Sequence, residues 1–206
     1  KEPLPQGMFS YHSPQDAEDQ YRLHLRVDAD GAGLLVINAS TVLHLNQTAV
    51  EYAYHLIKET EPDQVAQKIS DRYQVDPVVA RRDFDDFNDK IMTLIETPDL
   101  DPVTYLDIER QTPYTGQISA PYRLDCALTY RVGEGSLQEH APVDRVDREL
   151  STEEWIAILH KAYNQGIPHV LFTGGEPTLR EDLSTLLEKA EALGLVTGLL
   201  TDGLKF

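Results

Sequence analysis

The sequence predicts an α+β first half with three strands and three helices, followed by an α/β second half in which strands and helices alternate. Three observations support this division. Apolar and polar residues alternate along 21–45, with turn residues between the runs. Residues 46–97 repeat apolar side chains at helical spacing. From residue 121 onward, short apolar runs alternate with helical segments, which favours parallel strands joined by right-handed crossovers.

In the first half, residues 1–20 are rich in Pro, Gln and Asp and lack periodicity, so we expect a surface arm there. Residues 21–97 are expected to form the first domain, with an antiparallel meander of strands at 21–27, 34–37 and 42–45. The three helices that follow are predicted from one N-cap, Asn46, and two early prolines, Pro62 and Pro77. Residues 98–120, interrupted by proline and glycine, are interpreted as a linker.

In the second half, residues 121–206, we expect strands at 123–129, 169–173 and 196–200. A helix over 151–164 is predicted by the capping box of Ser151 and Glu154, and a helix over 182–193 is closed by Gly194. Only three strand–helix units are visible.

Composition excludes several classes of function. The 206 residues carry a formal charge of −17 and both halves are acidic, which argues against a nucleic-acid partner, including for a DNA-reading first half. No apolar run is long enough to span a bilayer, and the first residues lack the layout of a signal peptide. The lone cysteine is typical of a reducing compartment. We therefore expect a cytoplasmic protein with neither a nucleic-acid nor a membrane partner.

The segment Thr173-Gly174-Gly175-Glu176-Pro177 carries the most chemical information. It follows a buried strand, at the end of a parallel sheet where ligands usually bind. Two glycines would let a ligand approach the backbone, and Glu176 offers a carboxylate to a cationic group. A tight turn with a solvated glutamate is the alternative interpretation, because short motifs also match by accident.

Residues 121–206 resemble the beginning of radical S-adenosylmethionine enzymes, in which a Gly-Gly-Glu-Pro segment after the second barrel strand holds the methionine end of the cofactor. The flanking similarity lies in residues 124–131, 150–155, 166–173 and 201–203. The resemblance implies an enzyme with a partial (β/α) barrel, a 4Fe–4S cluster and a reductant protein as partner. It also implies that S-adenosylmethionine is bound by Gly174, Gly175, Glu176 and Pro177, and that its cleavage yields a deoxyadenosyl radical.

Residues 21–97 resemble the PqqD family, small winged-helix-like domains that recognise the leader of ribosomally made peptides. This resemblance rests on the order of strands and helices. It implies a precursor peptide as partner, and we expect its leader to add as a strand beside Val42, Leu43, His44 and Leu45. Together, the two halves resemble peptide maturases.

The cysteines depart from the family pattern. The family's C-x3-C-x2-C run should follow Tyr130-Arg131, but the chain continues Val132-Gly133. Cys126 lies within the preceding strand and is expected to be a small buried hydrophobe. One thiolate cannot hold a 4Fe–4S cluster, so no metal ligand and no catalytic residue is predicted among these residues. Two interpretations stay open: a cysteine loop is missing between Arg131 and Val132, or the chain is a non-catalytic peptide-binding or scaffold protein with a degenerate radical S-adenosylmethionine domain.

Overall fold

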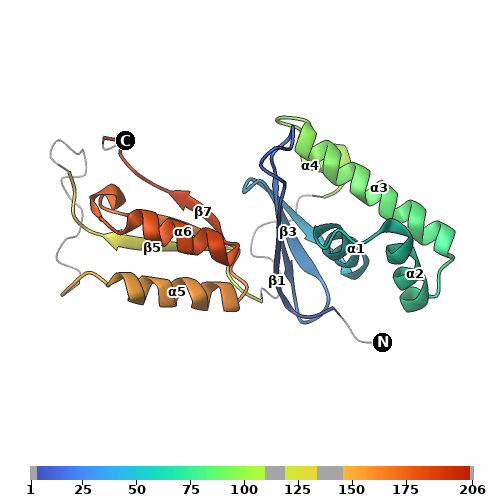
Figure 1. Ribbon diagram of the computed structural model, residues 1–206, viewed down its shortest axis with the longest axis horizontal. Coiled ribbons are helices and arrows are strands. Elements are labelled where there is room, and N and C mark those ends of the chain that lie inside the picture. Colours follow the sequence, from blue (N-terminus) through green and yellow to red (C-terminus); the bar gives the residue numbers. More distant parts are fainter. Residues whose placement is uncertain (1–3, 110–118, 134–145, 205–206) are drawn as a thin grey trace. The chain divides into compact units, whose positions relative to one another are not determined.

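The computed structural model describes residues 4–109, 119–133 and 146–204, and it divides the chain into two compact units, residues 1–119 and 120–206. The first unit is an antiparallel sheet with helices packed on it, and the second is a parallel sheet with two helices (Figure 1). The predicted mixed α/β class is confirmed.

The sheet of the first unit has four strands in the order β1-β2-β3-β4, all antiparallel. They span Gly7–His12 (β1), Arg22–Val27 (β2), Gly33–Ile37 (β3) and Thr41–Leu45 (β4). The three predicted strands are confirmed to within one residue. Strand β3 is one of the two inner strands, and all five of its residues are buried.

Strand β1 corrects two predictions. The sheet has one strand more than the three predicted, and residues 7–12 belong to it and not to a surface arm. They pair with β2, with Phe9 opposite Leu25. The Phe9 ring meets the Tyr54 ring edge-on at a centroid distance of 5.0 Å. Residues 7–12 lie between stretches rich in Pro, Gln and Asp, and six residues give little sequence evidence for a strand. This strand depends on pairing and on packing against the core, which local propensity does not report.

The three predicted helices are α1 (Gln47–Ile57), α2 (Pro62–Tyr73) and α3 (Pro77–Glu96). Helices α1 and α3 share the core with the sheet, and α2 packs against α1 and α3. The predicted cap is confirmed, since the Asn46 side chain accepts a hydrogen bond of 2.9 Å from the Ala49 N–H. Leu94 of α3 joins the core between the sheet and α1. A short helix, α4 (Pro102–Leu106), lies inside the predicted linker and corrects it, because Asp101 caps the turn that Pro102 begins. Residues 110–118 of that linker lie outside the described residues.

The second unit alternates strands and helices as predicted. Its strands are β5 (Arg123–Thr129), β6 (His169–Gly174) and β7 (Val196–Leu199), parallel and in that order. Its helices are α5 (Thr152–Asn164), the single turn η2 (Pro177–Leu179) and α6 (Leu183–Leu193). The capping box of Ser151 and Glu154 is confirmed, as is the left-handed Gly194 that ends α6.

The parallel arrangement positions the candidate site. Because all three strands run the same way, their carboxyl ends meet at one edge of the sheet. Residues 130–133, 175–180 and 200–203 follow those ends. Three parallel strands are described, and closure into a partial barrel stays an expectation from the resemblance. None of the helices in the described part of the chain has both the length and the apolar character needed to cross a membrane.

Candidate functional site

Glu176 connects the carboxyl ends of β6 and β7. Its side chain is 3% exposed. One oxygen, Oε1, accepts hydrogen bonds from the Thr178 N–H (2.9 Å), the Thr178 hydroxyl (2.6 Å) and the Thr201 hydroxyl (2.7 Å). The other, Oε2, accepts one from the Asp202 N–H at 2.8 Å. The carboxylate therefore holds together two loops that are distant in sequence.

These donors also keep Glu176 ionised. Burial alone would raise the pKa of this carboxyl group, because it disfavours the charged form. The hydrogen bonds from Thr178, Asp202 and Thr201 outweigh that effect and lower the pKa to about 2. Glu176 is thus a buried carboxylate with a full negative charge at neutral pH.

The two glycines before Glu176 face the chain's own backbone. The Gly175 N–H donates to the Thr129 carbonyl, and the Glu176 N–H donates to the Arg131 carbonyl, both at 2.7 Å. A Cβ atom at Gly174 would lie 2.1 Å from the Thr129 oxygen, and one at Gly175 would lie 2.1 Å from the Arg131 oxygen. The close approach that the sequence suggested for a ligand is therefore made by residues 129–131. Pro177, also buried, begins η2.

A second polar cluster, which the sequence did not indicate, surrounds Arg180. The guanidinium donates to the Leu128 carbonyl (3.0 Å) and the Leu150 carbonyl (3.1 Å). It also forms two bonds, of 2.8 and 2.7 Å, to the Asp182 carboxylate. Arg180 thereby fastens the end of β5 to the segment before α5. The only sequence signal was an Arg and an Asp shortly after the glycines, which is too common to be informative.

The predicted peptide-binding residues lie on β4, which pairs only with β3 among the described strands. Leu43 is 4% exposed and Val42 is 41% exposed. His44 is exposed, and Leu45 packs against the core. The strand therefore has an inward face, an outward face with an exposed apolar residue, and one edge without a described neighbour.

Comparison with known proteins yields solved structures and no family: no sequence-family model matches the chain. One solved structure is Streptococcus suis SuiB bound to precursor peptide SuiA, with a TM-score of 0.47, 16% identity, and coverage of 87% of this chain and 41% of that one. Another is Streptococcus suis SuiB bound to S-adenosylmethionine, with a TM-score of 0.45, 17% identity, and coverage of 90% and 41%. The chain spans about two fifths of the length of the solved chains. A likeness at these TM-scores carries no functional argument.

The residues present do not fit an iron–sulfur cluster. Cys126 is 2% exposed and packs in the core of the second unit. Burial, with a smaller contribution from Asp125, raises the pKa of its thiol to about 11, so the thiolate that binds iron is disfavoured. Across residues 4–109, 119–133 and 146–204, no group of three or more His, Cys, Asp or Glu side chains could hold a metal ion.

Proposed function

We propose that this chain belongs to a radical S-adenosylmethionine peptide maturase and supplies its leader-binding and cofactor-binding parts. The observation that carries the proposal is the buried, ionised carboxylate of Glu176 at the carboxyl edge of a parallel sheet. A buried charge is costly unless it is paired, and the groups paired with Glu176 here are neutral. A cationic ligand at this edge would complete the pairing.

The α-ammonium group of S-adenosylmethionine is such a cation. Each carboxylate oxygen has two lone-pair positions. Three donors crowd Oε1, whereas Oε2 receives only the Asp202 N–H, so Oε2 keeps one position for a further donor. In this proposal Glu176 binds the ammonium group through Oε2. Thr201 and Thr178 fix the direction in which the carboxylate points.

The glycines act indirectly in this proposal. By admitting the backbone of residues 129–131, Gly174 and Gly175 keep the end of β5 beside Glu176. The end of β5 is where the resemblance places the cluster loop. The present residues do not hold the cluster, so we assign the chain binding and orientation and no radical step.

The first unit would hold the precursor peptide. A strand edge is a template for an added strand, β4 has no described strand on its outer side, and the exposed Val42 offers an apolar contact beside it. A leader bound there would tether the rest of the peptide to the chain that binds the cofactor.

A second candidate function is a peptide-binding scaffold without turnover, favoured by one observation: the single cysteine is buried. Anaerobic iron and sulfide reconstitution of the complete gene product separates the two functions. About four irons per protein, with the absorbance of a 4Fe–4S cluster, support the maturase. A gene product that binds no iron supports the scaffold function instead.

The cofactor site is tested by titrating the 206-residue chain with S-adenosylmethionine while following backbone amide signals. We expect saturable shifts at Gly175, Asp202 and Gly203. Methylthioadenosine, which lacks the amino-acid end, should leave them unchanged. The Glu176→Gln variant should bind S-adenosylmethionine about 10- to 100-fold more weakly, since hydrogen bonds to charged groups contribute about 1.5–3 kcal/mol.

Glu188→Gln is the matched control, because Glu188 is exposed on α6 and lies outside the site. It should bind like the unmodified chain. Equal affinity of Glu176→Gln and Glu188→Gln, with both variants folded, would contradict the role given to Glu176. Equal shifts with methylthioadenosine would contradict recognition of the amino-acid end.

A further inference from the structure

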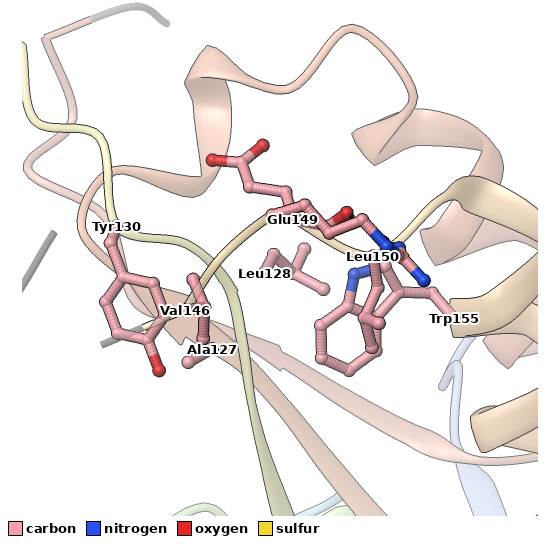
Figure 2. A pocket seen from close by; sticks show the side chains of 8 residues that line it. Ala127, Leu128, Tyr130, Val146, Glu149, Leu150 and Trp155 are labelled. Carbon is pink, nitrogen blue, oxygen red and sulfur yellow. Dashed lines mark hydrogen bonds between the residues drawn. The ribbon is translucent and has the colours of Figure 1, made fainter. Parts of the chain in front are cut away.

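A pocket of about 240 Å³ opens at the carboxyl end of β5, beside the start of α5. In Figure 2, Tyr130, Val146 and Ala127 lie on one side of it and Leu150 and Trp155 on the other. Leu128, Arg148 and Glu149 complete the lining. Small-molecule sites usually occupy about 300–1,000 Å³, so this pocket suits one amino-acid side chain better than a whole cofactor.

Trp155 is the unexplained group in this pocket. Its side chain is 8% exposed, and its indole Nε1 is buried and finds no hydrogen-bond partner among the described residues. An indole N–H is only a donor, so it needs an acceptor that the described residues do not supply. Buried polar groups in native proteins are nearly always paired, and an exception calls for a water or a ligand.

The charges at the pocket are already neutralised. Both terminal nitrogens of Arg148 bond to the Glu154 carboxylate, each at 2.7 Å. Glu149 accepts hydrogen bonds from Arg131 at 3.2 and 3.4 Å and from the Thr129 hydroxyl. A charged ligand would therefore find no free counter-charge among these residues. The pocket therefore fits an uncharged ligand that has an apolar part and one hydrogen-bond acceptor.

We propose that this pocket binds an apolar side chain of the peptide substrate, whose main-chain carbonyl accepts a hydrogen bond from Trp155 Nε1. A peptide residue supplies both features at the right scale. The proposal rests on the proposed function, because it takes a peptide as substrate. It assigns the pocket a part in selecting which residue of the peptide lies beside the candidate site.

The rim has to shift for this bond to form, since Nε1 has no contact with solvent in the free chain. The rim offers that freedom: Val146 is 43% exposed, and the Arg148 side chain is 64% exposed. Rotamer changes of this kind are common when a protein binds a partner.

The test uses the only tryptophan in the chain. With ¹⁵N-labelled indole, Trp155 gives one indole N–H signal in the spectrum of the 206-residue chain. The probes are N-acetyl-L-leucinamide and N-acetyl-L-phenylalaninamide, and the control is N-acetylglycinamide, which has the same carbonyls and no side chain. We expect a saturable downfield shift with the first two, at dissociation constants of about 1 mM or weaker for ligands of about a dozen heavy atoms.

Two substitutions localise the binding. Ala127→Leu places a side chain inside the pocket and should weaken probe binding at least about 10-fold. Ala157→Leu makes the same change at an exposed position of α5 outside the lining and should leave binding unchanged. Val146→Phe at the exposed rim is a second blocking variant if Ala127→Leu does not fold.

Three results would overturn the proposal: no saturable shift, an equal shift with N-acetylglycinamide, or a long-lived water at the indole proton that the probes do not displace. The probes contain neither a leader nor S-adenosylmethionine. If the probes shift Trp155 but the chain binds neither leader nor cofactor, the proposed function is refuted and probe binding in the pocket is not. If the chain binds leader and cofactor but the probes do not shift Trp155, the assignment of the pocket is refuted and the proposed function is not.

Discussion

Glu176 Oε2 accepts a hydrogen bond of 2.8 Å from the backbone N–H of Asp202, 26 residues further along the chain. This bond joins the loop after β6 to the loop after β7. The bond depends on the charge of the Glu176 carboxylate, because every group that contacts this carboxylate is a hydrogen-bond donor. The geometry of the candidate site is therefore coupled to the protonation state of one side chain.

We predict an acid-dependent loss of stability in the second unit that originates in Glu176. The pKa falls from its ordinary 4.5 to about 2 on folding, so the stabilisation is complete above about pH 4.5 and disappears as the pH falls toward 2. Glu176→Gln should cost about 1.5–3 kcal/mol at pH 7 and should flatten that pH dependence. Urea unfolding followed by Trp155 fluorescence measures both. Glu188→Gln is the control, and a Glu176→Gln variant as acid-sensitive as the unmodified chain would refute the assignment.

Gly175 is predicted to be irreplaceable for a steric reason. A Cβ there would meet the Arg131 carbonyl oxygen at 2.1 Å, which the backbone must relieve by moving. We expect Gly175→Ala to cost about 3 kcal/mol, the upper end for overpacking. Gly203→Ala is the informative comparison, because Gly203 has open space around it and a φ of +72°. That substitution should cost about 1–2 kcal/mol from backbone strain alone.

The same unfolding experiment compares these two glycine variants. If Gly203→Ala is as destabilising as Gly175→Ala, the contact with Arg131 is not what requires the glycine. If both are tolerated, the close approach of Gly175 to the Arg131 carbonyl is not needed for stability.

The sequence predicted those features of the fold that are local. Caps such as Asn46 and Ser151 act within three residues, and the period of the apolar residues reports which face is buried. The same reasoning located the Gly-Gly-Glu-Pro segment at the end of a parallel strand. Strand β1 was missed because it depends on β2, whose paired residues lie ten to twenty positions away.

The contacts of the site could not be read from the sequence. Glu176 meets Thr201 and Asp202 only because β6 and β7 lie side by side. Gly174 approaches Thr129 through the parallel pairing of β5 and β6, whose register shifts between Ala127 and Thr129. Such an irregularity has no sequence signature, and it determines that the glycines face the backbone.

We predict a separate pH dependence of stability in the first unit, which originates in His55. Its side chain is 6% exposed, and Nδ1 lies 3.1 Å from the Thr60 hydroxyl oxygen. Burial, with smaller contributions from the charges of Lys68 and Arg72, lowers its pKa from 6.5 to about 4. The unfolded state binds the proton first, so stability is lost as the pH falls from about 6.5 to 4, by up to about 3 kcal/mol.

Unfolding of the first unit, followed by hydrogen exchange of the amides in β3 and α1 at several pH values, measures this effect. His55→Gln should remove the pH dependence within that window. His160→Gln makes the same change at an exposed position of the second unit and should not alter it. A His55 ring signal that titrates near pH 6.5 in the folded chain would show that burial does not keep the ring neutral.

The last prediction concerns which edge of the first sheet accepts a peptide. In the described part of the chain, the sheet has two edge strands, β1 and β4. Ser10 and His12 are the exposed residues of β1, whereas β4 exposes Val42 beside His44. An added strand gains specificity from contacts between side chains, so the edge with an exposed apolar residue is the better acceptor.

We therefore expect synthetic peptides covering the short open reading frames beside the gene to include one that shifts and protects the amides of residues 41–45. Alternate residues of an edge strand direct their N–H toward the partner strand or away from it. Of Val42→Pro and Leu43→Pro, one should destabilise the pairing with β3, and the other should keep the fold and weaken the peptide. Shifts confined to residues 7–12 would move the docking edge to β1. Shifts on another surface, with residues 41–45 silent, would refute strand addition at β4, because a peptide that pairs with this edge must bond to its main chain.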